Sequence, residues 1–157
     1  MSLDPPQGGK WSSAGLRLGI VCARYNEVLT DALLAKVTAI IKDAGEPERL
    51  VVERVPGSHE IPVAMSLMLG AESFGCLVGL GVVIKGSTSH HHLVAESAGQ
   101  AMQQLAVECS TPIINGIIVT DSIEDAEARV TGSLDRGLEF GEAALHMAEL
   151  KRKWTKN

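Results

Sequence analysis

Short apolar runs alternate along the chain with longer segments whose apolar residues recur every three or four positions. Unbroken runs rich in Val and Ile are typical of strands buried on both faces of a parallel sheet. Such runs predict four strands, over residues 16–22, 50–55, 76–84 and 112–120.

The longer segments predict five helices, over residues 30–44, 60–72, 90–109, 123–130 and 137–154. Thr30 is expected to cap the first helix and Gly45 to end it. Pro62 is tolerated in the first turn of the second helix. The inward faces are expected to carry Leu33, Val37, Ile40, Ile41 and Ala44 on the first helix, Val94, Ala98, Ala101, Met102 and Leu105 on the third, and Gly141, Ala144, Leu145 and Ala148 on the last.

Alternation of strand and helix predicts an α/β fold: a three-layer α/β/α sandwich around a four-stranded parallel sheet, flavodoxin-like and a single domain. We expect this domain to span residues 15–154, after a flexible N-terminal segment, residues 1–14. In such sheets ligands bind beyond the carboxyl ends of the strands. Polar breaks fall at those ends, at residues 23–26, 56–60, 85–90 and 120–121, so we expect them to converge on one rim.

Composition narrows the classes of function. Of the 157 residues, 45% are hydrophobic and 3% aromatic, so the core is expected to be aliphatic. The net charge of -5 and the single basic cluster, Lys151 to Lys153 at a helix end, argue against nucleic-acid binding. The sequence has no apolar stretch long enough for a membrane span and no export signal, which predicts a cytoplasmic protein. Cys22, Cys76 and Cys109 each lie within or near an apolar run and are expected to be buried, reduced thiols.

The segment from Lys85 to His90 joins a strand to a helix. Backbone N–H groups at a helix start, with Ser and Thr hydroxyls, suit an anion such as phosphate. The alternative is an ordinary Ser/Thr helix cap, and the segment lacks the pattern of nucleotide phosphate loops.

His90, His91 and His92 are consecutive. Metal ligands sharing one helix face are spaced by four, so we expect no metal site here, and His59-Glu60 lacks the second histidine of the HExxH zinc pattern. One histidine beside a phosphate pocket suits proton transfer near neutral pH.

Three other rim residues have two interpretations each. Tyr25 either stacks on a flat ring or anchors its loop. Glu60 accepts bonds from ligand hydroxyls, complements the next helix, or does both. Arg129 either reaches an anion across a subunit boundary or pairs on the surface with Glu124 or Asp125.

Taken together, these motifs resemble the lumazine synthase family, also known as the riboflavin synthase beta chain. The resemblance runs from about Gly15 to Leu150. It is carried by Ala-Arg-Tyr-Asn at 23–26, Val-Pro-Gly-Ser-His-Glu-Ile-Pro at 55–62, Gly-Val-Val-Ile-Lys-Gly-Ser-Thr-Ser-His at 81–90, and the segments 112–120, 124–129 and 142–148.

The resemblance implies an enzyme without metal or organic cofactor. It would condense 5-amino-6-(ribitylamino)uracil with 3,4-dihydroxy-2-butanone 4-phosphate, giving 6,7-dimethyl-8-ribityllumazine, phosphate and water. The implied catalytic residue is His90. The implied binding residues for the pyrimidine and its ribityl chain are Tyr25, Ser58, His59, Glu60, Val83, Ile84 and Asn115. Those implied for the phosphate are Gly86, Ser87, Thr88 and Arg129.

Oligomerisation also follows from the resemblance. Family sites are shared between adjacent subunits of a pentamer, with Asn115 matching a neighbour's residue, and in some members twelve pentamers close into an icosahedral shell. The short segment 131–136 favours the shell. The resemblance also allows riboflavin synthase as a further partner.

The sequence also departs from the family pattern. His59 and Asn115 stand where aromatics are frequent, His91-His92 replaces an aromatic and an acidic residue, and Ser133 falls near a frequent lysine whose charge Arg136 could supply. These changes leave two alternatives: a non-catalytic flavin-binding or shell-forming paralogue and, by fold analogy alone, a redox carrier.

Overall fold

A four-stranded parallel sheet forms the centre of the computed structural model, which describes residues 8–88 and 90–155. The strand order is β2-β1-β3-β4, and each neighbouring pair is parallel. The strands are β1 (Arg17–Ala23), β2 (Arg49–Val55), β3 (Cys76–Ile84) and β4 (Ile113–Thr120). Each predicted strand is confirmed to within one residue at either end.

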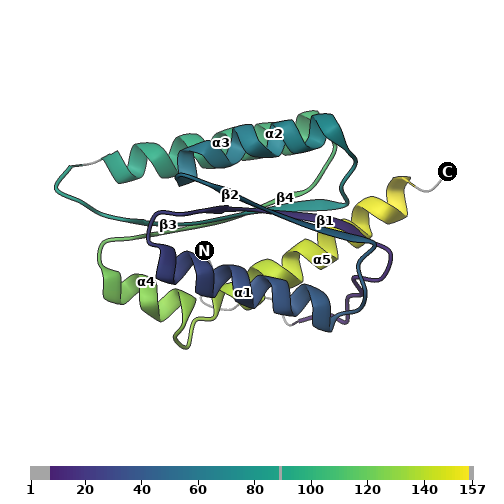
Figure 1. Ribbon diagram of the computed structural model, residues 1–157, viewed down its shortest axis with the longest axis horizontal. Helices are drawn as coiled ribbons and strands as arrows, with labels where there is room; N and C mark the ends of the chain where they lie inside the picture. Colours follow the sequence, from purple (N-terminus) through teal and green to yellow (C-terminus); the bar gives the residue numbers. More distant parts are fainter. Residues whose placement is uncertain (1–7, 89, 156–157) are drawn as a thin grey trace.

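Helices cover both faces of the sheet, which confirms the three-layer sandwich (Figure 1). One face carries α2 (Ile61–Ala71) and α3 (His90–Glu108). The other carries α1 (Glu27–Asp43), α4 (Ile123–Val130) and α5 (Arg136–Thr155). A short 3-10 turn, η1 (Ser58–Glu60), precedes α2, where the sequence predicted the helix itself to begin.

The core is aliphatic, as the composition predicted. It lies in two layers, one on each side of the sheet. Leu18, Ile20 and Leu80 are fully buried in the layer under α1 and α5. Burying a side chain of this size contributes about 1.5–3 kcal/mol. Gly141, Ala144, Leu145 and Ala148 are buried on α5, so its predicted inward face is confirmed.

The predicted start of the first helix is wrong. Helix α1 begins at Glu27, and Asn26 stands at the N-cap with φ 58°, in the left-handed region. Thr30 is buried inside the helix, and its hydroxyl donates to the Glu27 carbonyl over 3.3 Å. Asn tolerates positive φ better than most residues, so the chain turns one residue before the helix rather than at Thr30.

Two burial predictions are also wrong. Cys109 is exposed, because it follows the last residue of α3, whereas Cys22 and Cys76 are buried as predicted. Ala101 is exposed on α3 although its neighbour Met102 is buried. Successive helical residues point about 100° apart, so an apolar pair can straddle the edge of the buried face.

Trp11 and Ser12 lie against α5. The Trp11 ring stacks on His146 with centroids 4.1 Å apart, and the Ser12 N–H donates to Glu149 Oε1 over 2.9 Å. Residues 1–7 of the predicted flexible segment lie outside the described residues. In the part of the chain that the structure describes, no helix is both long and apolar enough to cross a membrane.

Candidate active site

A hollow of about 500 Å³ lies at the carboxyl ends of the strands, where the sheet topology predicted a site. We call it the rim pocket. It is built from the turns after β1, β2 and β3 and from the first turns of α3. Its lining residues are Tyr25, Asn26, Gly57, Ser58, His59, Glu60, Val82, Val83, Ile84, Gly86, Ser87, Thr88, His90, His91 and Val94.

The turn after β1 presents an aromatic ring at the pocket. Asn26 holds this turn in place, because its Nδ2 donates to the Val82 carbonyl of β3 over 2.8 Å. Tyr25, the residue before it, is 74% exposed while lining the pocket. At this exposure Tyr25 is not the half-buried loop anchor of the alternative interpretation, and its ring is free to stack on a flat ligand.

The turn after β2 brings a hydroxyl and a carboxylate to the same wall. Glu60 Oε2 accepts the Gly57 N–H over 2.9 Å, so the carboxylate caps the turn while still lining the pocket. Ser58 is buried, 5% exposed, against the backbone of β3. A Cβ added at Gly81 would stand 2.3 Å from Ser58 Oγ, so this approach requires glycine at position 81.

The loop after β3 is rich in hydrogen-bond donors. Gly86, Ser87 and Thr88 are exposed, and α3 begins at His90. The His90 N–H donates to Thr88 Oγ1 over 3.4 Å, which leaves the hydroxyl hydrogen of Thr88 free for a ligand. N–H groups at a helix start and hydroxyls favour an anion, and the positive end of the helix dipole adds to this.

The three consecutive histidines lie in different environments. His90 is exposed and lines the pocket, whereas His92 is exposed and does not line it. His91 is 6% exposed, and its Nδ1 lies 3.1 Å from the Thr88 carbonyl oxygen. His90 is thus the histidine best placed to exchange protons with a ligand.

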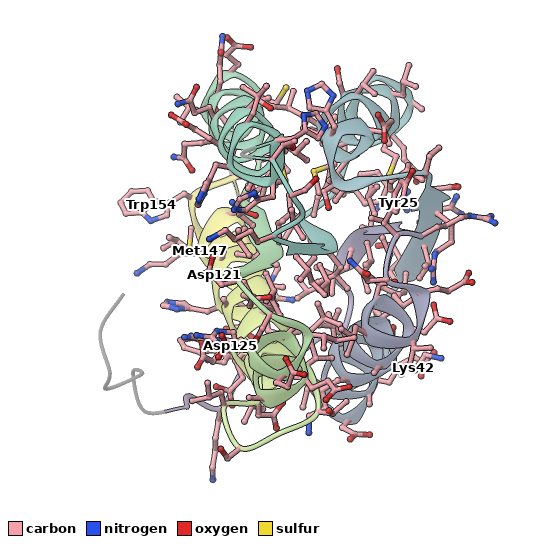
Figure 2. The ribbon with its side chains drawn as sticks, turned by 90° about the vertical axis from the view of Figure 1, so that its left-hand side faces the viewer. Tyr25, Lys42, Asp121, Asp125, Met147 and Trp154 are labelled. Carbon is pink, nitrogen blue, oxygen red and sulfur yellow. The ribbon has the colours of Figure 1, made fainter. Side chains whose placement is uncertain are left out.

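Two residues implied by the resemblance, Asn115 and Arg129, do not line the rim pocket of their own chain. Asn115 is exposed on β4, the edge strand, and its Oδ1 accepts the Ile117 N–H over 3.1 Å. Arg129 donates to the Asp125 carbonyl over 2.8 Å, with the Asp125 carboxylate 3.5 Å away. Figure 2 shows Asp125 and Tyr25 on opposite sides of the molecule.

Comparison with known proteins places these features in a family. The model of the 6,7-dimethyl-8-ribityllumazine synthase family matches residues 15–152. Proteins of that name from Xylella fastidiosa (strain M12), Aquifex aeolicus (strain VF5) and Cupriavidus necator are 37%, 35% and 39% identical over 147, 144 and 137 residues. These matches cover 92%, 90% and 87% of the chain and 96%, 94% and 81% of the relatives.

The chain belongs to the lumazine synthase family. It is therefore an enzyme of riboflavin biosynthesis, and the comparisons favour this over the non-catalytic paralogue.

Sequence reasoning missed five residues that line the rim pocket: Asn26, Gly57, Val82, His91 and Val94. Asn26 lies in the polar break at residues 23–26, and Gly57 follows Pro56 in a turn motif, so both positions at the rim were readable from the sequence. The involvement of Val82, His91 and Val94 depends on how the strands and α3 pack, which no local pattern encodes.

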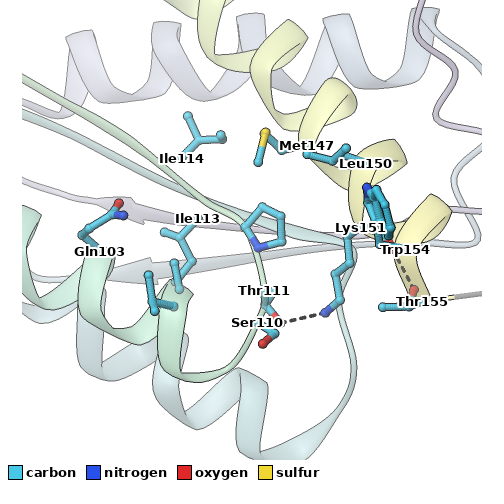
Figure 3. Close-up of a pocket in the computed structure, with 13 residues that line it drawn as sticks. Gln103, Ser110, Thr111, Ile113, Ile114, Met147, Leu150, Lys151, Trp154 and Thr155 are labelled. Atoms are coloured by element: carbon cyan, nitrogen blue, oxygen red, sulfur yellow. Dashed lines mark hydrogen bonds between the residues drawn. The ribbon is translucent and has the colours of Figure 1, made fainter.

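A second hollow, of about 510 Å³, lies toward the other end of the sheet, between the end of α3, the start of β4 and the end of α5 (Figure 3). Lys151 Nζ donates there to Thr111 Oγ1 over 2.7 Å and to the Phe74 carbonyl over 2.9 Å. Burial lowers the pKa of Lys151. The other side chains that line this second hollow are mostly apolar, and two of them, Val107 and Trp154, are 70% and 77% exposed. Fewer polar side chains line this hollow than line the rim pocket, and two of them, Lys151 and Thr111, bond to each other.

Proposed function

We propose that the rim pocket is where this enzyme condenses 5-amino-6-(ribitylamino)uracil with 3,4-dihydroxy-2-butanone 4-phosphate, giving 6,7-dimethyl-8-ribityllumazine, phosphate and water. One observation carries the proposal. Ten of the twelve residues implied by the family resemblance line this one hollow, although they come from three separate turns. The residues of the chain supply the chemistry, and the proposal needs no metal or organic cofactor.

The pyrimidine substrate occupies the side of the pocket formed by the first two turns. Tyr25 stacks on its ring, and the backbone of Val83 and Ile84 binds its polar edge. Ser58 and Glu60, with His59 beside them, bind hydroxyls of the ribityl chain. Since Glu60 Oε2 already accepts the Gly57 N–H, Oε1 is the oxygen left for the substrate.

The second substrate places its phosphate on the loop of Gly86, Ser87 and Thr88. Attack of the pyrimidine amine on the ketone needs proton transfers as the carbinolamine forms and loses water, and the exposed His90 imidazole serves both directions. Donors already placed around the phosphate stabilise it as it leaves. Holding two small substrates in contact lowers much of the remaining barrier.

An adjacent copy of the chain completes the site with Asn115 and Arg129. The location of Asn115 and Arg129 supports this arrangement, because neither residue lines the rim pocket of its own chain. Val107 and Trp154 are exposed and line a mostly apolar hollow beside β4, the strand that carries Asn115, and a contiguous apolar surface of this kind marks a site that another protein covers. We propose a pentamer or a shell of twelve pentamers, in the cytoplasm, where the free thiols Cys22 and Cys76 stay reduced. Mass measurement in solution separates the two assemblies.

The reaction is tested by mixing the purified protein with both substrates and following the absorbance of the lumazine. His90→Ala should lower kcat about 10²- to 10⁴-fold, the range for loss of a general acid–base. His92→Ala, which removes an exposed histidine two residues away, is the matched control and should retain the wild-type rate. Equal rates for the two variants would contradict the role of His90.

The phosphate site has its own test. Arg129→Glu should raise the KM for the butanone phosphate at least about tenfold, because a carboxylate would face the phosphate, and leave the KM for the pyrimidine nearly unchanged. A rise of the same size for both substrates would contradict a phosphate role.

A further inference from the structure

The loop proposed to bind phosphate has little packing of its own. Gly86, Ser87 and Thr88 are exposed, and a Cβ added at Gly86 would meet no atom within 4 Å. Such a loop keeps its shape only if neighbouring elements fix its ends. Its β3 end is fixed by the Lys85 N–H, which donates to the Thr120 carbonyl over 2.9 Å.

The other end is held by a side chain of α3. His91 Nδ1 lies 3.1 Å from the Thr88 carbonyl oxygen, three residues earlier. A carbonyl only accepts hydrogen bonds, so Nδ1 carries the hydrogen, and in the neutral ring Nε2 then carries a lone pair. Nε2 is buried and has no partner among the described residues, and the ring lies against His92 with centroids 4.0 Å apart.

We propose that His91 is a positioning residue: its bond to the Thr88 carbonyl holds the loop in the shape that binds the substrate's phosphate. This rests on the proposed role of the loop. The two adjacent histidines then divide the work. His90 is exposed to the substrate and moves protons, whereas His91 is buried, uses its one hydrogen on the loop, and touches no reacting atom.

The nitrogens of His91 can be tested separately. His91→Phe keeps a ring of similar size and removes both nitrogens. His91→Asn keeps a donor near the position of Nδ1 and removes Nε2. His91→Phe removes one hydrogen bond to the loop. It should therefore raise both the KM for the butanone phosphate and the inhibition constant of inorganic phosphate about 2- to 12-fold. The KM for the pyrimidine should not change, and His91→Asn should restore most of the loss.

Two further variants make the outcome decisive. His92→Phe is the matched control and should behave as wild type. Ser87→Ala tests the loop itself and should raise the same two phosphate constants. If Ser87→Ala has no effect, the loop does not bind phosphate and the proposed site fails. If Ser87→Ala has its effect and His91→Phe does not, only the positioning role of His91 is overturned.

A readout independent of the variants is the tautomer of His91 in the wild-type oligomer. A solid-state ¹⁵N spectrum of histidine-labelled protein should contain one ring protonated at Nδ1 alone. A His91 ring protonated at Nε2 alone would overturn the proposal, because Nδ1 would then have no hydrogen for the Thr88 carbonyl.

Discussion

Replacement of Gly81 by Ala tests how closely the fold and the ribityl site depend on one another. The new Cβ would stand 2.3 Å from Ser58 Oγ and 3.3 Å from Ser58 Cβ. Ordinary contact begins at 3.4 Å, so the hydroxyl must retreat by about 1.1 Å, the difference between 3.4 and 2.3 Å. Ser58 Cβ is nearly at contact distance already, so the side chain turns about χ1 and the hydroxyl leaves its place.

The expected effects follow from that movement. Overpacking lowers the free energy of unfolding by about 1–3 kcal/mol. Loss of one hydrogen bond to the ribityl chain, worth about 0.5–1.5 kcal/mol, raises the KM for the pyrimidine about 2- to 12-fold. The KM for the butanone phosphate should stay close to that of wild type, since the phosphate loop is untouched. Urea unfolding measures the first quantity, and lumazine absorbance measures the others.

Gly79→Ala is the matched control. Its Cβ would stand 2.8 Å from Met102 Sδ and 2.9 Å from Ile61 Cγ2, in the core behind the pocket. It should cost similar stability without raising either KM. The double variant Gly81→Ala with Ser58→Ala removes the clashing oxygen, so stability should recover while the pyrimidine KM stays high. The reasoning is refuted if the two glycine variants change the pyrimidine KM equally, or if the double variant is no more stable than Gly81→Ala.

Three further predictions concern stability and thiol reactivity. Gly70 is exposed on α2, and a Cβ added there would meet no atom within 4 Å. Gly70→Ala should therefore raise the free energy of unfolding, measured with urea, by about 0.5–1 kcal/mol. A lower free energy of unfolding would mean that α2 does not extend to this residue. Burial raises the pKa of Cys76 to about 12, so at pH 8 roughly one molecule in ten thousand carries the Cys76 thiolate. Iodoacetamide should therefore label the exposed Cys109 in the native protein, and Cys76 only after unfolding. Burial lowers the pKa of Lys151 in the folded protein below its value in the unfolded chain. Between these two pKa values the unfolded chain binds more protons than the folded protein, so stability rises with pH across that range. Wild type should therefore gain stability relative to Lys151→Met between neutral and alkaline pH, as urea unfolding across that range measures, and a relative loss would contradict the direction.

Much of the fold follows from local patterns. The four segments rich in Val, Ile and Leu are long enough to be recognised as strands, although β2, at the edge of the sheet, is buried only at Val55. A parallel sheet places all of its carboxyl ends at one edge. The rim pocket was therefore predictable as a location before any family resemblance.

Details that depend on distant parts of the chain were not predictable. Asn26 caps nothing with its side chain but reaches Val82, 56 residues away, and that bond sets where α1 begins. Successive residues leave a helix in directions about 100° apart, so the pattern indicated that the histidines differ, but it did not indicate that His91 is the buried one, with Nδ1 beside the Thr88 carbonyl. Arg129 pairs with Asp125 within one chain and lies outside the rim pocket of that chain, so no local pattern indicates the phosphate of a neighbouring pocket as its partner.

The central claim is that one copy of the chain supplies His90 and its neighbour supplies Arg129 to the same pocket. This claim is tested directly by co-expressing His90→Ala and Arg129→Glu chains in equal amounts. The two chains carry different tags, so that mixed oligomers can be purified. Random mixing leaves about one pocket in four with both residues intact, one half multiplied by one half, so with the butanone phosphate well below its KM, lumazine formation should recover to about a quarter of the wild-type rate. If the mixed oligomers are no more active than the two variants alone, each pocket takes both residues from a single chain, and the account is contradicted.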